Sequence, residues 1–127
     1  MDKEIVSTTK APAAIGPYSQ AVKAGGFLFV SGQIPLVPET GELVLGDIKE
    51  QAERVLDNIN AILGAAGTSF DRVIKTTIFL TDMGNFAAVN EVYSKYFPTN
   101  PPARACVAVA QLPRGVAVEI EAIALCA

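Results

Sequence analysis

The spacing of apolar residues predicts two amphipathic helices. One runs from Asp47 to about Ala66, where Asp47 and Glu50 resemble a capping box and Gly67 suits the end. A second helix is expected from about Gly84 to Phe97, because Pro98 stops it. Aliphatic side chains at helical spacing mark the buried face of the first helix: Ile48, Ala52, Val55, Leu56, Ile59, Ile62 and Leu63. Aromatic residues dominate the second, and we expect them in the core rather than in a stacking platform for a ligand: Phe86, Tyr93, Tyr96 and Phe97.

Six other segments have the residue types and turn boundaries of β-strands. They are residues 4–8, 19–23, 27–31, 73–81, 103–110 and 116–125. No internal repeat, low-complexity tract or linker interrupts the chain, so we expect a single domain over residues 1–127. The element order is then β-β-β-α-β-α-β-β. Two helices cover only one face of a six-stranded sheet, which predicts an α+β fold with one open sheet face.

The last strand indicates what each sheet face meets. In VAVEIEAIALC, successive side chains point to opposite faces. One face is wholly apolar and should pack against the helices: Val118, Ile120, Ala122 and Ala124. The other face combines Glu119 and Glu121 with Ile123 and Leu125, a mixture that suits neither open solvent nor a dry core. We therefore expect a subunit interface with a polar cleft in it.

Arg104 lies in the strand before the last one and needs a partner or a task, because burying a lone charge is costly. The two strands are consecutive and are expected to form a hairpin in which Ala110 opposes Gly115. Cys106 then opposes Glu119, and Arg104 lies on the same face two residues along. A slip of one residue would place Arg104 on the opposite face. In the expected register, the charges surround a site.

The amino-acid composition argues against several classes of binding and catalytic site. The 127-residue chain has a net charge of −3, no histidine, and ten Lys and Arg residues that are scattered along it. A nucleic-acid-binding surface is therefore not expected. Without His, neither a Ser-His-Asp nor a Cys-His nucleophile exists, and two isolated Cys do not make a zinc site. Catalysis would rely on carboxylates, Arg, Tyr, hydroxyls, backbone amides and water.

The chain has no membrane or export signal that we recognise. No stretch approaches the about 20 apolar residues of a membrane span, and the N-terminus MDKEIVSTTK lacks the apolar region of a signal peptide. We expect a cytoplasmic protein that does not bind membranes, with Cys106 and Cys126 as free thiols.

Several candidate residues have both a plain and a functional interpretation. Arg104 and an acid of the last strand form either a cross-strand ion pair or a fork for a substrate carboxylate; the spare acid favours the fork. For Cys106, the lack of His favours a small buried residue over a nucleophile. Tyr18, in a Gly-Pro-Tyr turn, either packs or contacts a ligand. Gly32 marks a bulge, or a place where a ligand approaches the backbone.

These residues lie in segments that occur together in one protein family. APAAIGPYSQAV, VSGQIP, KTTIFLTDM, PPARACVAVAQLP and VEIEAIA follow in order between Ala11 and Leu125. The chain closely resembles the RidA (YjgF) family of reactive-intermediate deaminases over nearly its whole length. The resemblance implies a chorismate-mutase-like α+β fold with a mixed six-stranded sheet. It also implies a homotrimer whose open sheet faces meet in a central barrel-like core, with three clefts between subunits.

The resemblance further implies an enzyme that hydrolyses 2-imino acids to 2-keto acids and ammonia. The imines arise by tautomerisation of enamines such as 2-aminoacrylate and 2-aminocrotonate, which PLP-dependent serine and threonine dehydratases release. No cofactor or metal is implied.

Residue roles follow from the same resemblance. Arg104 would clamp the substrate carboxylate, and the Cys106 backbone N–H would donate to the same group. Glu119 would hold and polarise the attacking water. The cleft would be lined by residues of two subunits: Tyr18, Ser31, Gly32 and Asn90. We expect partial burial to raise the pKa of Glu119 and Arg104 to oppose that shift.

Two other functions remain open at this stage. A trimer that binds keto acids or other small carboxylates as a sensor would use the same clefts without turnover. An RNA-cleaving or translation-inhibiting role, ascribed to relatives, is disfavoured by the acidic charge balance and the absence of His.

Overall fold

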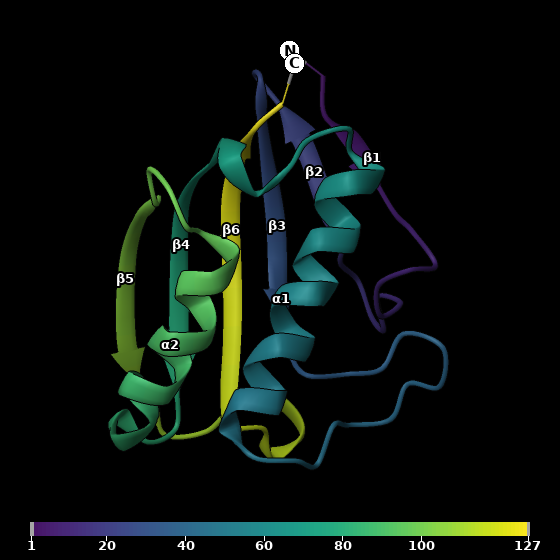
Figure 1. Ribbon diagram of the computed structural model, residues 1–127. Helices are drawn as coiled ribbons and strands as arrows, with labels where there is room; N and C mark the ends of the chain where they lie inside the picture. Colours follow the sequence, from purple (N-terminus) through teal and green to yellow (C-terminus); the bar gives the residue numbers. More distant parts are fainter. Residues whose placement is uncertain (1, 127) are drawn as a thin grey trace.

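The computed structural model describes residues 2–126 and shows a mixed six-stranded sheet with both helices on one face (Figure 1). The helices are α1 (Ile48–Ala65) and α2 (Phe86–Tyr96). The strands are β1 (Glu4–Val6), β2 (Ala21–Ala24), β3 (Phe27–Gln33), β4 (Val73–Leu80), β5 (Ala103–Ala108) and β6 (Val118–Leu125). Their spatial order is β1-β2-β3-β6-β4-β5, and only β4 and β5 are parallel. The expected α+β layers and element order are confirmed.

Helix α1 begins and ends as its sequence predicts. Asp47 Oδ1 accepts a hydrogen bond of 2.9 Å from the Glu50 backbone N–H, and Gly67 takes the left-handed conformation (φ 79°) after the last turn. The predicted face is buried except for Ile48, which is partly exposed. Asn58 is also buried, and its side-chain amide donates to the carbonyls of residues 34 and 36. This contact fastens the segment after β3 to α1.

Helix α2 starts two residues later than expected. Residues 83–85 form a single 3₁₀ turn instead, in which Asp82 Oδ1 accepts from the Gly84 backbone N–H at 2.8 Å. The prediction that the aromatic residues join the core is confirmed for Tyr93 and Phe97, whose ring centroids are 4.6 Å apart. Phe86 and Tyr96 are only partly buried against it.

The expected hairpin between the last two strands is wrong, because β4 lies between β5 and β6. Strand β4, helix α2 and β5 form a parallel crossover unit, which places β5 beside β4. Strand β6 then pairs with the other edge of β4, where Phe79 opposes Glu119. On β5, Arg104 is the register partner of the buried Thr76. Arg104 therefore lies on the helix side of the sheet, and Glu119 lies on the open side.

The alternation predicted for the last strand is confirmed. Its apolar face is buried under the helices, whereas its other face is open. Four large apolar side chains of the open face are between a third and a half exposed: Phe27, Phe29, Val107 and Leu125. Apolar side chains gathered on one face can mark a site of interaction with another molecule. Among residues 2–126, no helix is long and apolar enough to cross a membrane.

Candidate functional site

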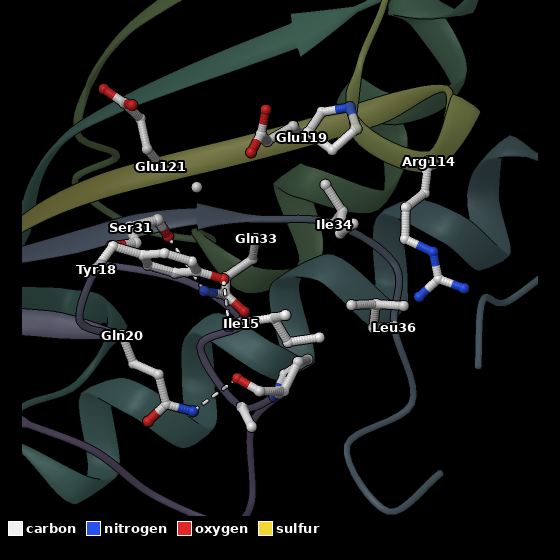
Figure 2. A pocket seen from close by; sticks show the side chains of 14 residues that line it. Ile15, Tyr18, Gln20, Ser31, Gln33, Ile34, Leu36, Arg114, Glu119 and Glu121 are labelled. Atoms are coloured by element: carbon white, nitrogen blue, oxygen red, sulfur yellow. Dashed lines mark hydrogen bonds between the residues drawn. The ribbon is translucent and has the colours of Figure 1, made fainter. Parts of the chain in front are cut away.

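A cleft of about 670 Å³ opens on the side of the sheet where Glu119 lies (Figure 2). The loop of residues 12–20, the end of β3, residues 34–36, the turn at 113–114 and β6 form its walls. Four of the expected site residues line it: Tyr18, Ser31, Gly32 and Glu119. We call this space the Glu119 cleft.

Gly32 and Glu119 fit against each other. The pairing of β3 with β6 shifts between Val30 and Gln33, an irregularity that agrees with the bulge or turn expected at Gly32. A Cβ at Gly32 would lie 2.5 Å from Glu119 Oε2 and 2.9 Å from Glu119 Cδ. The missing side chain therefore leaves room for the carboxyl group of Glu119 beside β3. The group that approaches the Gly32 backbone closely is thus a side chain of the same chain.

Glu119 has an environment that disfavours its charge. Burial raises the pKa of its carboxyl group, and the neighbouring negative charge of Glu121 raises it further. The expected rise through partial burial is thus confirmed. The expected opposition by Arg104 is wrong within one chain, because the sheet separates the two side chains. A carboxyl group with a raised pKa is better suited to take up and return a proton near neutral pH.

Tyr18 lies in a loop that is tightly held, and Ser31 of β3 binds to that loop. Gly16 has φ 123°, and the Tyr18 backbone N–H donates to the Gly16 carbonyl at 2.9 Å, which forms the tight turn. Tyr18 is 54% exposed, and its hydroxyl accepts a hydrogen bond of 3.4 Å from the Ile15 backbone N–H (Figure 2). Ser31 Oγ donates to the carbonyl of Ser19 at 2.6 Å. The buried amide of Gln20 donates to the carbonyl at residue 12 and so fixes the rest of the loop.

Arg104 is held by helix α2. Its Nη1 donates to Asn90 Oδ1 at 2.7 Å, and its guanidinium carbon lies 5.4 Å and 4.9 Å from the ring centroids of Phe86 and Tyr93. In residues 2–126 the only ion pairs within 4 Å join Lys23 to Glu4 and Lys49 to Glu91. The interpretation of Arg104 as one half of an ion pair within the sheet is therefore wrong. Its charge is not neutralised by an acid of the described chain.

Cys106 lies two residues along β5, on the same side as Arg104, and packs partly buried against the core. Burial raises the pKa of its thiol, and the charge of Arg104 acts in the opposite sense. A raised pKa keeps the thiol protonated, which favours the interpretation as a small packing residue over a nucleophile. We call Phe86, Asn90, Tyr93, Arg104 and Cys106 the Arg104 cluster.

The expected site residues thus form two groups on opposite faces of one sheet. Asn90 joins Arg104 and does not line the Glu119 cleft of its own chain. Sequence reasoning missed Arg114, which lines the cleft and donates from Nη1 to the carbonyl of Gly41 at 3.1 Å. The expectation that Phe86 and Tyr93 belong only to the core is incomplete, because both rings also face the Arg104 guanidinium. Among residues 2–126, no three His, Cys, Asp or Glu side chains gather as a metal site would require.

Known proteins are similar to this chain in sequence and in fold. The chain matches the family described as endoribonuclease L-PSP over residues 8–126. A RutC family protein of Pyrococcus abyssi is 58% identical to it over 98% of both chains. A Mus musculus protein named 2-iminobutanoate/2-iminopropanoate deaminase is 54% identical, over 97% of this chain and 91% of its own. The crystal structure of E. coli TdcF with bound serine is 48% identical, with a TM-score of 0.93 over 98% of this chain and 99% of that one.

A match over nearly the whole chain confirms the resemblance seen in the sequence. The chain belongs to the RidA family, which also carries the names YjgF, RutC and endoribonuclease L-PSP.

Proposed function

We propose that this chain hydrolyses 2-imino acids to 2-keto acids and ammonia, in sites that two copies share. The observation that carries the proposal is the placement of two complementary groups. Arg104 offers a positive charge without an acidic partner on one face, and Glu119 offers a carboxyl group with a raised pKa in a cleft on the other. A 2-imino acid needs both, a cation for its carboxylate and a base for the attacking water.

A shared site requires copies to meet through the open sheet face. That face exposes a set of large apolar side chains, which supports burial against other copies. We propose a homotrimer with a central barrel-like core. In it, β5 at the edge of one sheet brings the Arg104 cluster to the Glu119 cleft of the next copy. Each site would then contain Arg104, Cys106 and Asn90 from one copy and Tyr18, Ser31, Gly32 and Glu119 from another.

The reaction needs few groups because a protonated imine carbon is already electrophilic. Arg104, assisted by the Cys106 backbone N–H, fixes the carboxylate and so orients C2 of the substrate. Glu119 takes a proton from water as the water oxygen bonds to C2. It then returns that proton to the nitrogen. The C–N bond breaks, the C–O bond becomes the keto group, and the hydroxyl proton leaves with ammonia as ammonium.

The substrates we propose are the imines of 2-aminoacrylate and 2-aminocrotonate. The support is the name of the mouse relative, which refers to 2-iminopropanoate and 2-iminobutanoate. The bound serine of E. coli TdcF is a further three-carbon carboxylate held by a related protein. The zero count of histidines and the net charge of −3 give no support to RNA cleavage.

A coupled assay tests the proposal. A serine/threonine dehydratase generates the enamine in a buffer without amines, and the appearance of keto acid is followed with wild type, Arg104→Ala and Glu119→Ala. We expect wild type alone to accelerate keto acid formation. A wild-type rate equal to the uncatalysed rate would contradict the proposed reaction.

Binding separates an enzyme from a carboxylate sensor, which the same two groups of residues also suit. Arg104→Ala should abolish keto acid binding in both cases. Glu119→Ala should leave binding in place and stop turnover only in an enzyme.

A further inference from the structure

Helix α2 holds the Arg104 guanidinium with three neutral side chains. Phe86, Asn90 and Tyr93 are spaced by four and three residues and so share one helix face. Asn90 accepts a hydrogen bond from Arg104, whereas Phe86 and Tyr93 present their rings to it. Because none of these partners carries a negative charge, they orient the guanidinium without neutralising it. Tyr93 is the nearer ring and the more deeply buried of the two.

A hydroxyl of the sheet fixes the Tyr93 ring. Tyr93 Oη and Thr76 Oγ1 share a hydrogen bond of 2.7 Å, and only 5% and 1% of these residues' surfaces are exposed. Thr76 of β4 is also the register partner of Arg104 on β5. The contacts therefore close a loop from Arg104 to the Tyr93 ring, from the ring to Thr76, and back through the paired strands. Loss of either hydroxyl leaves the other buried without its partner.

Tyr93 places no negative charge beside Arg104, because its phenol is neutral. Burial raises the pKa of the Tyr93 phenol, while the Thr76 hydrogen bond and the Arg104 charge act in the opposite sense. The phenol therefore stays neutral near pH 7. A neutral ring supports the guanidinium through its π-face and leaves the full charge for an incoming anion.

We propose that Tyr93 and Thr76 are positioning residues for Arg104, which set the direction in which its guanidinium receives a substrate carboxylate. The inference rests on the proposed function only in taking Arg104 as the group that binds this carboxylate. Arginine has one of the largest side-chain entropies to lose on binding. A guanidinium already oriented by Tyr93, Asn90 and Phe86 loses less of it, and so binds the carboxylate more tightly.

Calorimetric titration with 2-oxobutanoate, the keto acid product, tests the proposal without requiring turnover. The variants are Tyr93→Leu, Tyr93→Phe and Thr76→Val, and the uncharged amide of 2-oxobutanoate is titrated in parallel. We expect Tyr93→Leu to weaken binding of the acid about tenfold through loss of the ring. Tyr93→Phe and Thr76→Val should each weaken it about threefold through loss of the hydroxyl pair. Binding of the amide should not change, and KM for the imine should rise with little change in kcat.

Tyr96→Phe is the matched control. Tyr96 lies on the same helix, but its Oη donates to Asp57 Oδ1 of α1 at 2.9 Å, and its ring is not one of the two that stack on Arg104. This variant should keep wild-type affinity for the keto acid even if its melting temperature falls. If Tyr93→Leu does not fold, the comparison of Tyr93→Phe with Tyr96→Phe decides the question.

The outcomes separate this inference from the reaction. Wild-type affinity in the Tyr93 and Thr76 variants, or an equal loss in Tyr96→Phe, would overturn the positioning role and leave imine hydrolysis unaffected. Keto acid binding by wild type without imine hydrolysis would contradict the reaction. The positioning role would then still stand if the Tyr93 variants bind the acid more weakly.

Discussion

Only strand β4 lies between β5, which carries Arg104, and β6, which carries Glu119. The electrostatic environments of the two side chains are nevertheless opposite. The guanidinium of Arg104 is exposed and is held only by neutral groups of α2. The carboxyl group of Glu119 is half-buried beside a second acid, and both conditions raise its pKa. The first environment suits the binding of an anion, whereas the second suits the gain and loss of a proton.

This difference matches two separate tasks in one reaction. A group that binds an anion is most useful when its charge is permanent and its direction is set in advance. A group that moves protons is most useful when its two protonation states are close in free energy. Within one chain, placing the groups on opposite faces lets separate sets of neighbours orient them: α2 holds Arg104, and Gly32 of β3 makes room for Glu119. The following predictions test this division, from the largest expected effect to the smallest.

Mixed assembly tests whether the two groups act in different copies. Arg104→Ala and Glu119→Ala, each nearly inactive alone, are denatured, mixed in equal amounts and refolded together. We expect about a quarter of wild-type activity, because each site draws its two halves from independently chosen copies. Initial rates of imine hydrolysis provide the measurement, and each variant refolded by itself is the control. No recovery in the mixture would place both groups in a site within one chain.

Arg104→Lys tests the permanent, oriented charge. Lysine keeps the charge but has neither the planar fork nor the flat surface that stacks on Phe86 and Tyr93. We expect affinity for 2-oxobutanoate to fall about 10- to 100-fold, as the loss of charged hydrogen bonds implies. Calorimetry measures this directly. An affinity equal to wild type would mean that charge alone is recognised.

Gly32→Ala tests the placement of Glu119. The added Cβ would displace the carboxyl group, since it would lie 2.5 Å from Glu119 Oε2. We expect kcat to fall about tenfold, because small misplacements of reacting groups are costly, with the Kd for keto acid unchanged. Gly64→Ala is the matched control, as its Cβ would meet no atom within 4 Å and alanine favours the helix. A kcat in Gly32→Ala equal to that of Gly64→Ala would refute the placement argument.

Glu121→Gln tests the proton-handling group more finely. Glu119 acts as a base only when ionised, so activity is present above its raised pKa and is lost as pH falls through it. Removing the charge of Glu121 removes one of the two causes of that rise, while burial remains. The acid side of the pH–rate profile should therefore move to lower pH, with little change on the plateau. A movement to higher pH would contradict this electrostatic assignment.

Features that depend on neighbouring residues in the sequence could be predicted. The buried face of α1, the Asp47 cap and the alternation around Glu119 follow from local periods and caps, and the structure confirms them. The family resemblance added Ser31 and Asn90 to the candidate residues and supplied the proposed roles of all of them. The expectation that Arg104 and the acids of the last strand are buried holds only for Glu119, which is partly buried, because Arg104 and Glu121 are exposed.

Strand neighbours could not be predicted as reliably, since pairing is not local. Consecutive strands favoured a hairpin between β5 and β6, but α2 between β4 and β5 makes the parallel crossover the better solution. With the wrong neighbour, Arg104 was placed on the face of Glu119. The stacking of Tyr93 on Arg104 and the fit of Gly32 against Glu119 depend on pairings between distant segments, and no local pattern indicates them.

The separation of Arg104 and Glu119 by the sheet has a consequence for how activity depends on the amount of protein. In the proposed arrangement, a single chain contains no complete site. The rate of imine hydrolysis is therefore proportional to the concentration of assembled chains and not to the total concentration of chains. Specific activity should hold constant at high protein concentration and decline on dilution below the dissociation constant of the assembly. A newly synthesised chain would accordingly be inactive until it assembles with other copies.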